Sequence, residues 1–256
     1  MTTPEGLHWL TSPELERLLV AAEGGKLSVP LVPAELLAAG FRAAEILSVL
    51  AGLDGPAAAR VLRALLFDRA ARPAPHLDLV WTGPETRVAT SRDTAVLVRE
   101  LFASARASVL IAGFAFDHGR DLFEALAGVM HAHGVTTEIY LDIREQAAPG
   151  VPIAAHVEEY VARFLAENWP FGPPLPALFY DPRTAQPGAR ASLHAKCIVV
   201  DLARTLITSA NFTDRGQTRN IELGVLIEDP DFASRVAAQW RSLAEAGVLE
   251  RATLAC

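Results

Sequence analysis

The residues with the clearest chemical potential lie in one short stretch near the end of the chain. His194 and Lys196 stand two positions apart, Asp201 follows, and Ser209 and Asn211 come shortly after. The chain has only two lysines among its 23 basic residues, so a lysine at this place is unusual for its composition. A lysine ammonium is a compact point charge that fits beside one phosphate oxygen, whereas the arginine fork needs more room. The stretch therefore indicates chemistry at a phosphate.

Together with Glu222, these side chains have the chemistry to cleave a phosphodiester without a metal ion or another cofactor. A neutral His194 can attack phosphorus if a carboxylate, for which Glu222 is the candidate, fixes the tautomer of its ring. Lys196, Ser209 and Asn211 can stabilise the charge that builds on the phosphate oxygens. An acid must also protonate the leaving group, and a second histidine is the usual source near neutral pH. Because the motif occurs once, we expect a homodimer that brings two copies of it together across a two-fold axis.

The pattern around the motif predicts strands. Residues 192–201 are expected to form one strand, which a tight connection joins to a second strand over residues 205–209. Alternation along the first strand would place His194 and Lys196 on one face and turn Cys197 toward a buried surface.

A further strand is expected over residues 221–227. Glu222 lies on one face of this strand, while Ile221, Leu223 and Val225 lie on the opposite, apolar face. From this position the carboxylate could reach the imidazole.

The remaining sequence divides into two patterns. Residues 1–75 show leucines at helical spacing between glycine and proline breaks, beginning with a capping box at Thr11 and Glu14. The sequence Arg72-Pro-Ala-Pro75 is expected to form a linker. From Leu77 onward, short apolar strands alternate with amphipathic helices, and Gly134 is placed to end one of these helices. We therefore expect an α/β fold preceded by a small all-helical region.

Composition narrows the function without fixing it. A formal net charge of −7 argues against nucleic-acid binding by bulk attraction, although a local basic groove can exist on an acidic protein. The two cysteines, Cys197 and Cys256, form neither a disulfide framework nor a metal-ligand pattern. The first residues lack a signal-peptide pattern, and no apolar run is long enough to span a bilayer. These features predict a cytoplasmic protein that is not bound to a membrane.

The His-x-Lys-x4-Asp stretch, continued by Ser209-x-Asn211 and Asn220-x-Glu222, closely resembles the signature of the phospholipase D superfamily in its single-motif, nuclease-like form. The resemblance reaches back to about Leu77. It implies a mixed β-sheet flanked by helices over residues 76–256, after a helical region over residues 1–75. The phrases Val80–Glu85 and Leu193–Cys197 are similar, more narrowly, to the phospholipase-D-like component of the DISARM anti-phage system.

The resemblance also implies roles for the motif residues. It implies that His194 is the nucleophile or acid and that Lys196 and Asn211 bind the phosphate. It also implies that Asp201 mainly supports the segment that carries the histidine. It further implies that no metal is needed and that two copies complete the site. One departure is Thr208, because the family usually has a glycine before the serine, which lets backbone approach the phosphate closely.

The leading hypothesis is thus a metal-independent nuclease that acts through a phosphohistidine in bacterial anti-phage defence, with DNA a better candidate than RNA. Other proteins of the defence system are possible partners. Two alternatives stay open. One is a binding or scaffold subunit of a defence complex with little or no turnover. The other is a phospholipid hydrolase or phosphatidyltransferase, against which the sequence shows no basic amphipathic helix for docking on a membrane.

Overall fold

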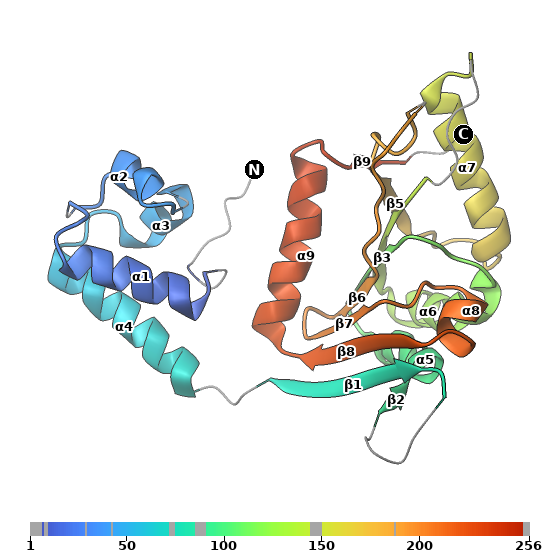
Figure 1. Ribbon diagram of the computed structural model, residues 1–256, viewed down its shortest axis with the longest axis horizontal. Helices are drawn as coiled ribbons and strands as arrows, with labels where there is room; N and C mark the ends of the chain where they lie inside the picture. The colour runs from blue at the N-terminus through green and yellow to red at the C-terminus, as the bar shows by residue number, and fades with distance from the viewer. Residues whose placement is uncertain are drawn as a thin grey trace. The chain divides into compact units, whose positions relative to one another are not determined.

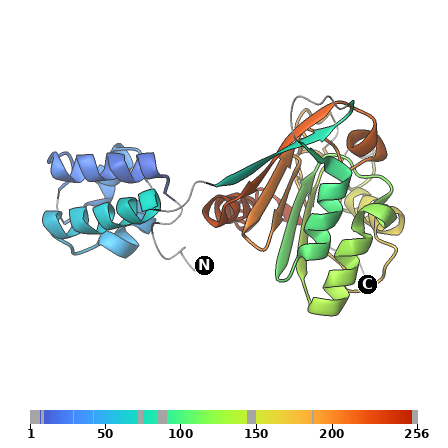
Figure 2. The same cartoon turned by 90° about the horizontal axis from the view of Figure 1, so that it is seen from below.

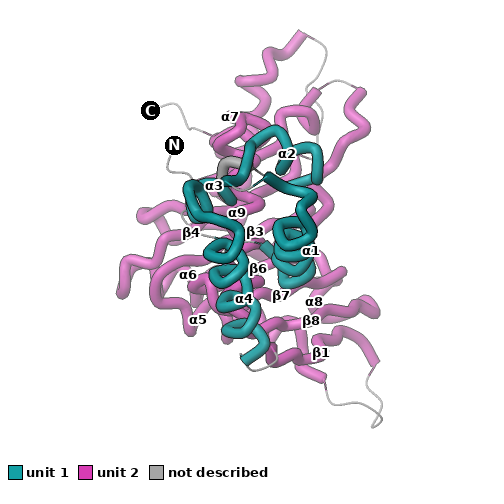
Figure 3. Tube along the Cα trace, turned by 90° about the vertical axis from the view of Figure 1, so that its left-hand side faces the viewer, with its two compact units in different colours: residues 1–74 teal, residues 75–256 magenta. Residues whose placement is uncertain are grey.

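Two compact units make up the chain, residues 1–74 and residues 75–256, and Figure 3 colours them separately. The computed structural model describes residues 7, 10–28, 30–41, 43–71, 75–84, 91–143, 150–186 and 188–252, of which 43–45 are described by their backbone alone. Most of the expected linker at residues 72–75 and Cys256 lie outside the described residues.

The first unit is helical, as the leucine spacing predicts. Its helices are α1 (Ser12–Glu23), α2 (Pro33–Ala38), α3 (Ala43–Leu50) and α4 (Gly55–Ala71). The capping box is confirmed, because the Thr11 hydroxyl accepts the Glu14 amide while the Glu14 carboxylate accepts the Thr11 amide. Leucines from these helices form a core of their own.

The second unit contains all the strands of the described residues. Its elements are β1 (His76–Thr82), β2 (Arg92–Asp93), α5 (Thr94–Ser104), β3 (Ser108–Gly113), α6 (Gly119–His133), β4 (Thr136–Leu141), α7 (Ile153–Asn168), β5 (Ala177–Tyr180), β6 (Cys197–Val200), β7 (Arg204–Thr208), α8 (Asp214–Thr218), β8 (Glu222–Glu228), α9 (Pro230–Glu245) and β9 (Glu250–Arg251). Within the described part of the chain they build one sheet with the order β2-β1-β8-β7-β6-β3-β4-β5-β9 (Figure 1).

This sheet is mixed. The pairs β3–β4 and β4–β5 are parallel, while β6, β7 and β8 run antiparallel to their neighbours. Parallel neighbours need a crossover helix, which α6 and α7 supply, whereas β6, β7 and β8 follow one another along the chain. The expected α/β class, with a mixed sheet flanked by helices, is confirmed.

Helices cover the two faces of the sheet unequally. The core on one face is formed with α5, α6 and α7 and contains Ile198 and Leu226. On the other face a smaller core is formed with α9 and contains Cys197, Val199 and Ala237. Figure 2 shows the strands between α9 on one side and α5 and α6 on the other. Successive residues of β6 thus face different cores, as strand alternation requires.

Helix ends follow local rules here. Gly134 ends α6 with φ +68°, and its N–H donates to the Met130 carbonyl, as expected for a glycine cap. Asp229 caps the start of α9 and is followed by Pro230 in its first turn. No helix among the described residues is long and apolar enough to cross a membrane.

Candidate active site

The motif histidine and lysine lie just before β6 rather than inside it. The prediction of a strand over residues 192–201 is therefore wrong in its first half, because β6 begins only at Cys197. The reason is a long-range contact, since the Leu193 N–H donates to the buried carboxylate of Asp142 (2.7 Å). A buried carboxylate from β4's end satisfies this amide, so the segment does not need a neighbouring strand there.

Lys196 folds back onto His194. Its Nζ donates to the His194 carbonyl oxygen (2.9 Å) and lies 3.0 Å from Nδ1 and 3.4 Å from Nε2 of the ring. The two side chains are thus brought together by the curl of the lysine and not by strand alternation. Phe114, directly after β3, contacts both, with its ring centroid 4.6 Å from the imidazole centroid and 5.4 Å from Nζ.

The surroundings of Lys196 shift its proton equilibrium. The residue is only 7% exposed, and this burial lowers the pKa of the ammonium, while the negative charge of Glu222 acts in the opposite direction. A carboxylate close enough to influence Lys196 therefore belongs to the same site.

Glu222 is held by two other polar residues. Its Oε2 accepts the Ser209 hydroxyl, and its Oε1 accepts the Asn220 amide (2.9 Å). The hydrogen bonds of the described residues do not join Glu222 to the imidazole, so its expected contact with His194 is not made in this state. Ser209 is in turn fixed by the Leu223 N–H, which donates to its hydroxyl oxygen (3.1 Å).

Asn211 has an unusual environment. Its side-chain oxygen is buried and has no hydrogen-bond partner among the described residues. A buried acceptor without a partner costs about 1–3 kcal/mol. The loop that carries it is tightly packed, because a Cβ on Gly216 would lie 2.5 Å from the Asn211 carbonyl oxygen.

Thr208, which replaces the usual glycine of the family, forms a hydrogen bond within this loop. Its hydroxyl accepts the Ala210 N–H (3.0 Å), and its own N–H donates to the Lys196 carbonyl (3.2 Å). Gly224 is its partner across β7 and β8, and a Cβ there would come within 3.0 Å of the Thr208 Cβ. The glycine on the neighbouring strand makes room for the threonine.

Asp201 lies at the other end of β6, roughly 17 Å along the chain from Lys196 at about 3.3 Å per residue. Its carboxylate accepts the backbone N–H groups of Arg106, Ala107 and Ser108 at the start of β3. Asp201 and Leu202 both have positive φ, 53° and 51°, in the tight turn between β6 and β7. The structure therefore brings Asp201 to a position that supports the sheet, apart from His194.

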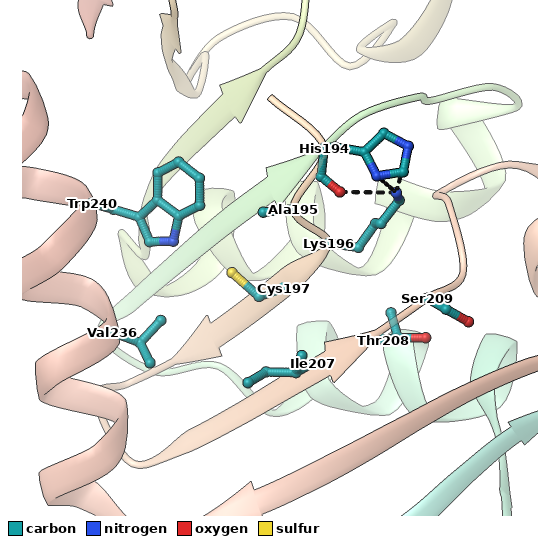
Figure 4. Close-up of a pocket in the computed structure, with 9 residues that line it drawn as sticks. All are labelled: His194, Ala195, Lys196, Cys197, Ile207, Thr208, Ser209, Val236 and Trp240. Atoms are coloured by element: carbon teal, nitrogen blue, oxygen red, sulfur yellow. Dashed lines mark hydrogen bonds between the residues drawn. The ribbon is translucent and has the colours of Figure 1, made fainter. Parts of the chain in front are cut away.

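One cavity of about 470 Å³ unites the motif with a helix that sequence reasoning missed. His194, Lys196, Thr208 and Ser209 line one part of it, and Val236 and Trp240 of α9 line another (Figure 4). The signal for α9 was present, since Asp229-Pro230 is a typical helix start and residues 230–245 have apolar residues at helical spacing.

His118 and Trp169 lie outside this cavity, whereas Cys197 lines it. His118 is exposed and forms a hydrogen bond with Asp117 (3.1 Å) that raises its pKa. Trp169 is buried in the core. Cys197 is also buried, and burial raises the pKa of its thiol to about 11.

The fold and the motif residues define a known class of protein. The family model described as "Cardiolipin synthase, PLD-like domain" matches residues 98–244, which is more than half of the chain. The chain belongs to this family of phospholipase-D-like domains.

Proteins similar to the chain include a curated relative and several solved structures. The DISARM protein DrmC of Bacillus paralicheniformis is 29% identical over 159 residues, which cover 59% of this chain and 56% of that protein. The matched region thus spans little more than half the length of that relative.

Similar solved structures come from three bacteria. A phospholipase D family member, Nuc from Salmonella typhimurium, is 22% identical with a TM-score of 0.46, over 71% of this chain and 100% of that chain. NucT from Helicobacter pylori is 17% identical with a TM-score of 0.46, over 67% and 97%. Phosphatidylserine synthase from Haemophilus influenzae is 15% identical with a TM-score of 0.50, over 80% and 49%.

Proposed function

We propose that this protein is a phosphodiesterase of the phospholipase D superfamily and that its substrate is nucleic acid, with DNA favoured over RNA. The observation that carries the proposal is the meeting of His194, Lys196 and Ser209 in one cavity. An imidazole, an ammonium and hydroxyl and amide groups are together suited to phosphoryl transfer.

The reaction would proceed in two displacements. Nε2 of His194 attacks phosphorus, the bond to the leaving oxygen breaks, and an acid gives that oxygen a proton. Water then attacks the phosphohistidine and releases the second product together with the free imidazole. Lys196 must first move from the ring toward the phosphate, because an ammonium that donates to Nδ1 leaves the ring proton on Nε2, whereas attack by Nε2 needs that proton on Nδ1. Apart from the water and the acid, side chains of one chain supply the groups in this scheme.

The scheme also needs an acid, for which a second histidine would be suited. Among the described residues, the cavity of a single chain is lined by one histidine, His194. We propose that a second copy of the chain provides the acid. The sheet face next to the cavity is apolar and exposed. It contains Leu77, Leu79, Ile207, Ile221 and Leu223. We call it the β1-β8-β7 face.

This face is continuous with the site. Ile207 lines the cavity and is in register with Val225, which is in register with Leu79. Leu223 is 56% exposed and exchanges hydrogen bonds with Ser209. A second copy seated on these residues would bury apolar surface and lie beside the phosphate-binding groups.

The deciding experiment is incubation of the pure protein with labelled single- and double-stranded DNA and RNA, with and without EDTA. We expect cleavage that survives the chelator and is lost in His194→Asn. A covalent adduct should also be trapped by rapid acid-free denaturation, with phosphate on His194. If no nucleic acid is cut while a control nuclease works, the hydrolase proposal fails for these polymers.

The place of this activity is proposed to be anti-phage defence, because the curated relative is named as a DISARM protein. Phage resistance should be compared between cells carrying the wild type and cells carrying His194→Ala. Resistance that is lost in the variant supports turnover. Resistance that persists points to the alternative of a binding or scaffold subunit.

A lipid substrate is the second alternative, since the matching family model is described by a cardiolipin synthase. Release of headgroup from phosphatidylglycerol or phosphatidylcholine vesicles, under conditions in which nucleic acids stay intact, would favour it.

A further inference from the structure

The cavity has an apolar end that the proposed phosphoryl transfer does not use. Val236 and Trp240 reach it from α9, and Cys197 and Ile207 form its floor on β6 and β7. In Figure 4, Ala195 and Cys197 lie between Trp240 and the His194–Lys196 pair. The apolar end is thus an extension of the phosphate site on the α9 side of the sheet.

The walls of this end are fixed by neighbours. The Trp240 ring packs on the buried Tyr140 ring with centroids 5.0 Å apart. Its indole also lies near the thiol of Cys197, whose pKa it acts to lower, and Cys197 is paired in register with Ile207. A Trp side chain held on two sides but still partly exposed to a cavity is a prepared surface and not a mobile one.

A phosphodiester carries two ester substituents, and both must go somewhere. With phosphorus near His194 and its free oxygens near Lys196 and Ser209, one substituent can extend past Ala195 toward Trp240. The whole cavity, at about 470 Å³, has the size of sites for small organic ligands. It suits a phosphate with one attached nucleoside.

We propose that this apolar end is a base-binding subsite, in which the nucleobase next to the scissile phosphate stacks on Trp240. The inference rests on the proposed function, since it assumes a nucleic-acid phosphodiester. An acyl chain gains equally from any apolar wall, whereas a flat base gains in addition from an indole face. Stacking also tolerates any base, so the subsite would bind nucleotides without strong sequence preference.

The test uses a substrate with a single scissile bond, the dinucleotide of two thymidines, and two counterparts that each lack one base. Wild type, Trp240→Phe and Trp240→Leu are compared, with Phe67→Leu as a control for loss of an exposed aromatic residue elsewhere. Leucine keeps apolar packing against Tyr140 but removes the aromatic face. Urea unfolding checks that each variant is folded.

We expect removal of one of the two bases to lower kcat/KM about tenfold in the wild type, in Trp240→Phe and in Phe67→Leu. In Trp240→Leu, the base-bearing and base-free substrates should be cleaved at similar rates. An unchanged preference for the base in Trp240→Leu would overturn the subsite.

A binding arm keeps the inference separate from the hydrolase proposal. Equilibrium dialysis of the same three dinucleotides against His194→Asn, with and without Trp240→Leu, measures the coupling between the base and the indole without turnover. A base-dependent affinity that disappears with Trp240→Leu supports the subsite even if no cleavage is found. If the base makes no difference to affinity, or if Trp240→Leu alters only phosphatidylglycerol hydrolysis, the subsite does not bind bases.

Discussion

Nζ of Lys196 lies 3.0 Å from Nδ1 of His194, and the same ammonium donates to the His194 carbonyl oxygen. In the free protein, the Lys196 ammonium that is proposed to bind the phosphate thus contacts His194, the proposed nucleophile. Because the ammonium can only donate, the ring nitrogen it contacts must accept, which leaves the ring proton on the other nitrogen. A bound phosphate that attracts the Lys196 ammonium would remove its contact with Nδ1 of His194.

The space around Lys196 predicts that its charge alone is not sufficient. Lys196→Arg keeps the charge, but the guanidinium needs more room than this 7% exposed position beside His194 and Phe114 offers. We expect both Lys196→Arg and Lys196→Met to lose activity about 100-fold or more, on the scale of a lost transition-state donor. Steady-state cleavage assays check this, and near-normal activity in Lys196→Arg would contradict it.

The Glu222 charge should be visible in the pH profile. Burial lowers the pKa of Lys196 and Glu222 raises it, so Glu222→Gln should lower that pKa further. If the charged lysine is needed, the alkaline limb of kcat/KM moves to lower pH in Glu222→Gln. Rates between about pH 6 and 10 test this. Glu228→Gln, at the far end of β8, is the matched control and should leave the limb in place.

The lowered pKa of Lys196 also makes the stability of the folded protein depend on pH. Between the lowered pKa of Lys196 in the folded state and the ordinary lysine value of about 10.4, the unfolded chain binds more protons. Stability from this group therefore rises with pH in that window, and its cost is largest below the folded pKa. We expect Lys196→Met to be at least as stable as the wild type at pH 7, with the difference shrinking toward pH 10. Urea midpoints across this range measure it.

Asp201 should matter for folding more than for chemistry. Asp201→Asn keeps a residue type that tolerates φ +53° but loses charged hydrogen bonds to three backbone amides, and we expect about 1 kcal/mol of lost stability. Asp201→Ala loses the acceptor altogether and adds backbone strain, for about 3 kcal/mol. Activity per folded molecule should stay within severalfold of the wild type in both. A folded Asp201→Asn protein without activity would return Asp201 to the chemistry.

The proposed dimer can be broken on the β1-β8-β7 face. Leu223→Lys puts a charge at a 56% exposed position, so the single chain should fold normally while the dimer and the activity are lost together. Val96→Lys, at an exposed position on α5 toward the opposite face, is the control. Light scattering gives the mass, and a fully active wild-type monomer would remove the need for a second copy.

Local pattern was enough for much of the fold. The change near residue 77 from helical leucine spacing to alternating strands and helices marks the start of the sheet, because strands and helices have different periods. Gly134 and the box at Thr11 ended and began helices as predicted, since caps act within one turn.

Contacts between distant residues account for what the pattern missed. The strand expected from residue 192 starts at Cys197 because Asp142, some 50 positions earlier, binds the Leu193 amide. Glu222 lies beside the site, but its two carboxylate oxygens accept hydrogen bonds from Ser209 and Asn220. The amphipathic helix α9 lines the cavity with Val236 and Trp240, and the spacing of the motif residues does not predict this contact.

Thr208 and Gly224 are paired across β7 and β8. The glycine that the family usually has at position 208 is replaced here by threonine, and the glycine of this pair lies on β8 instead. The two positions thus share one volume. A relative that has glycine before its serine is free to carry a side chain opposite it, so we expect the two positions to change together during evolution. Substituting glycine at 208 alone would leave a gap beside the loop of Asn211, whereas exchanging both residues would conserve the space between the strands.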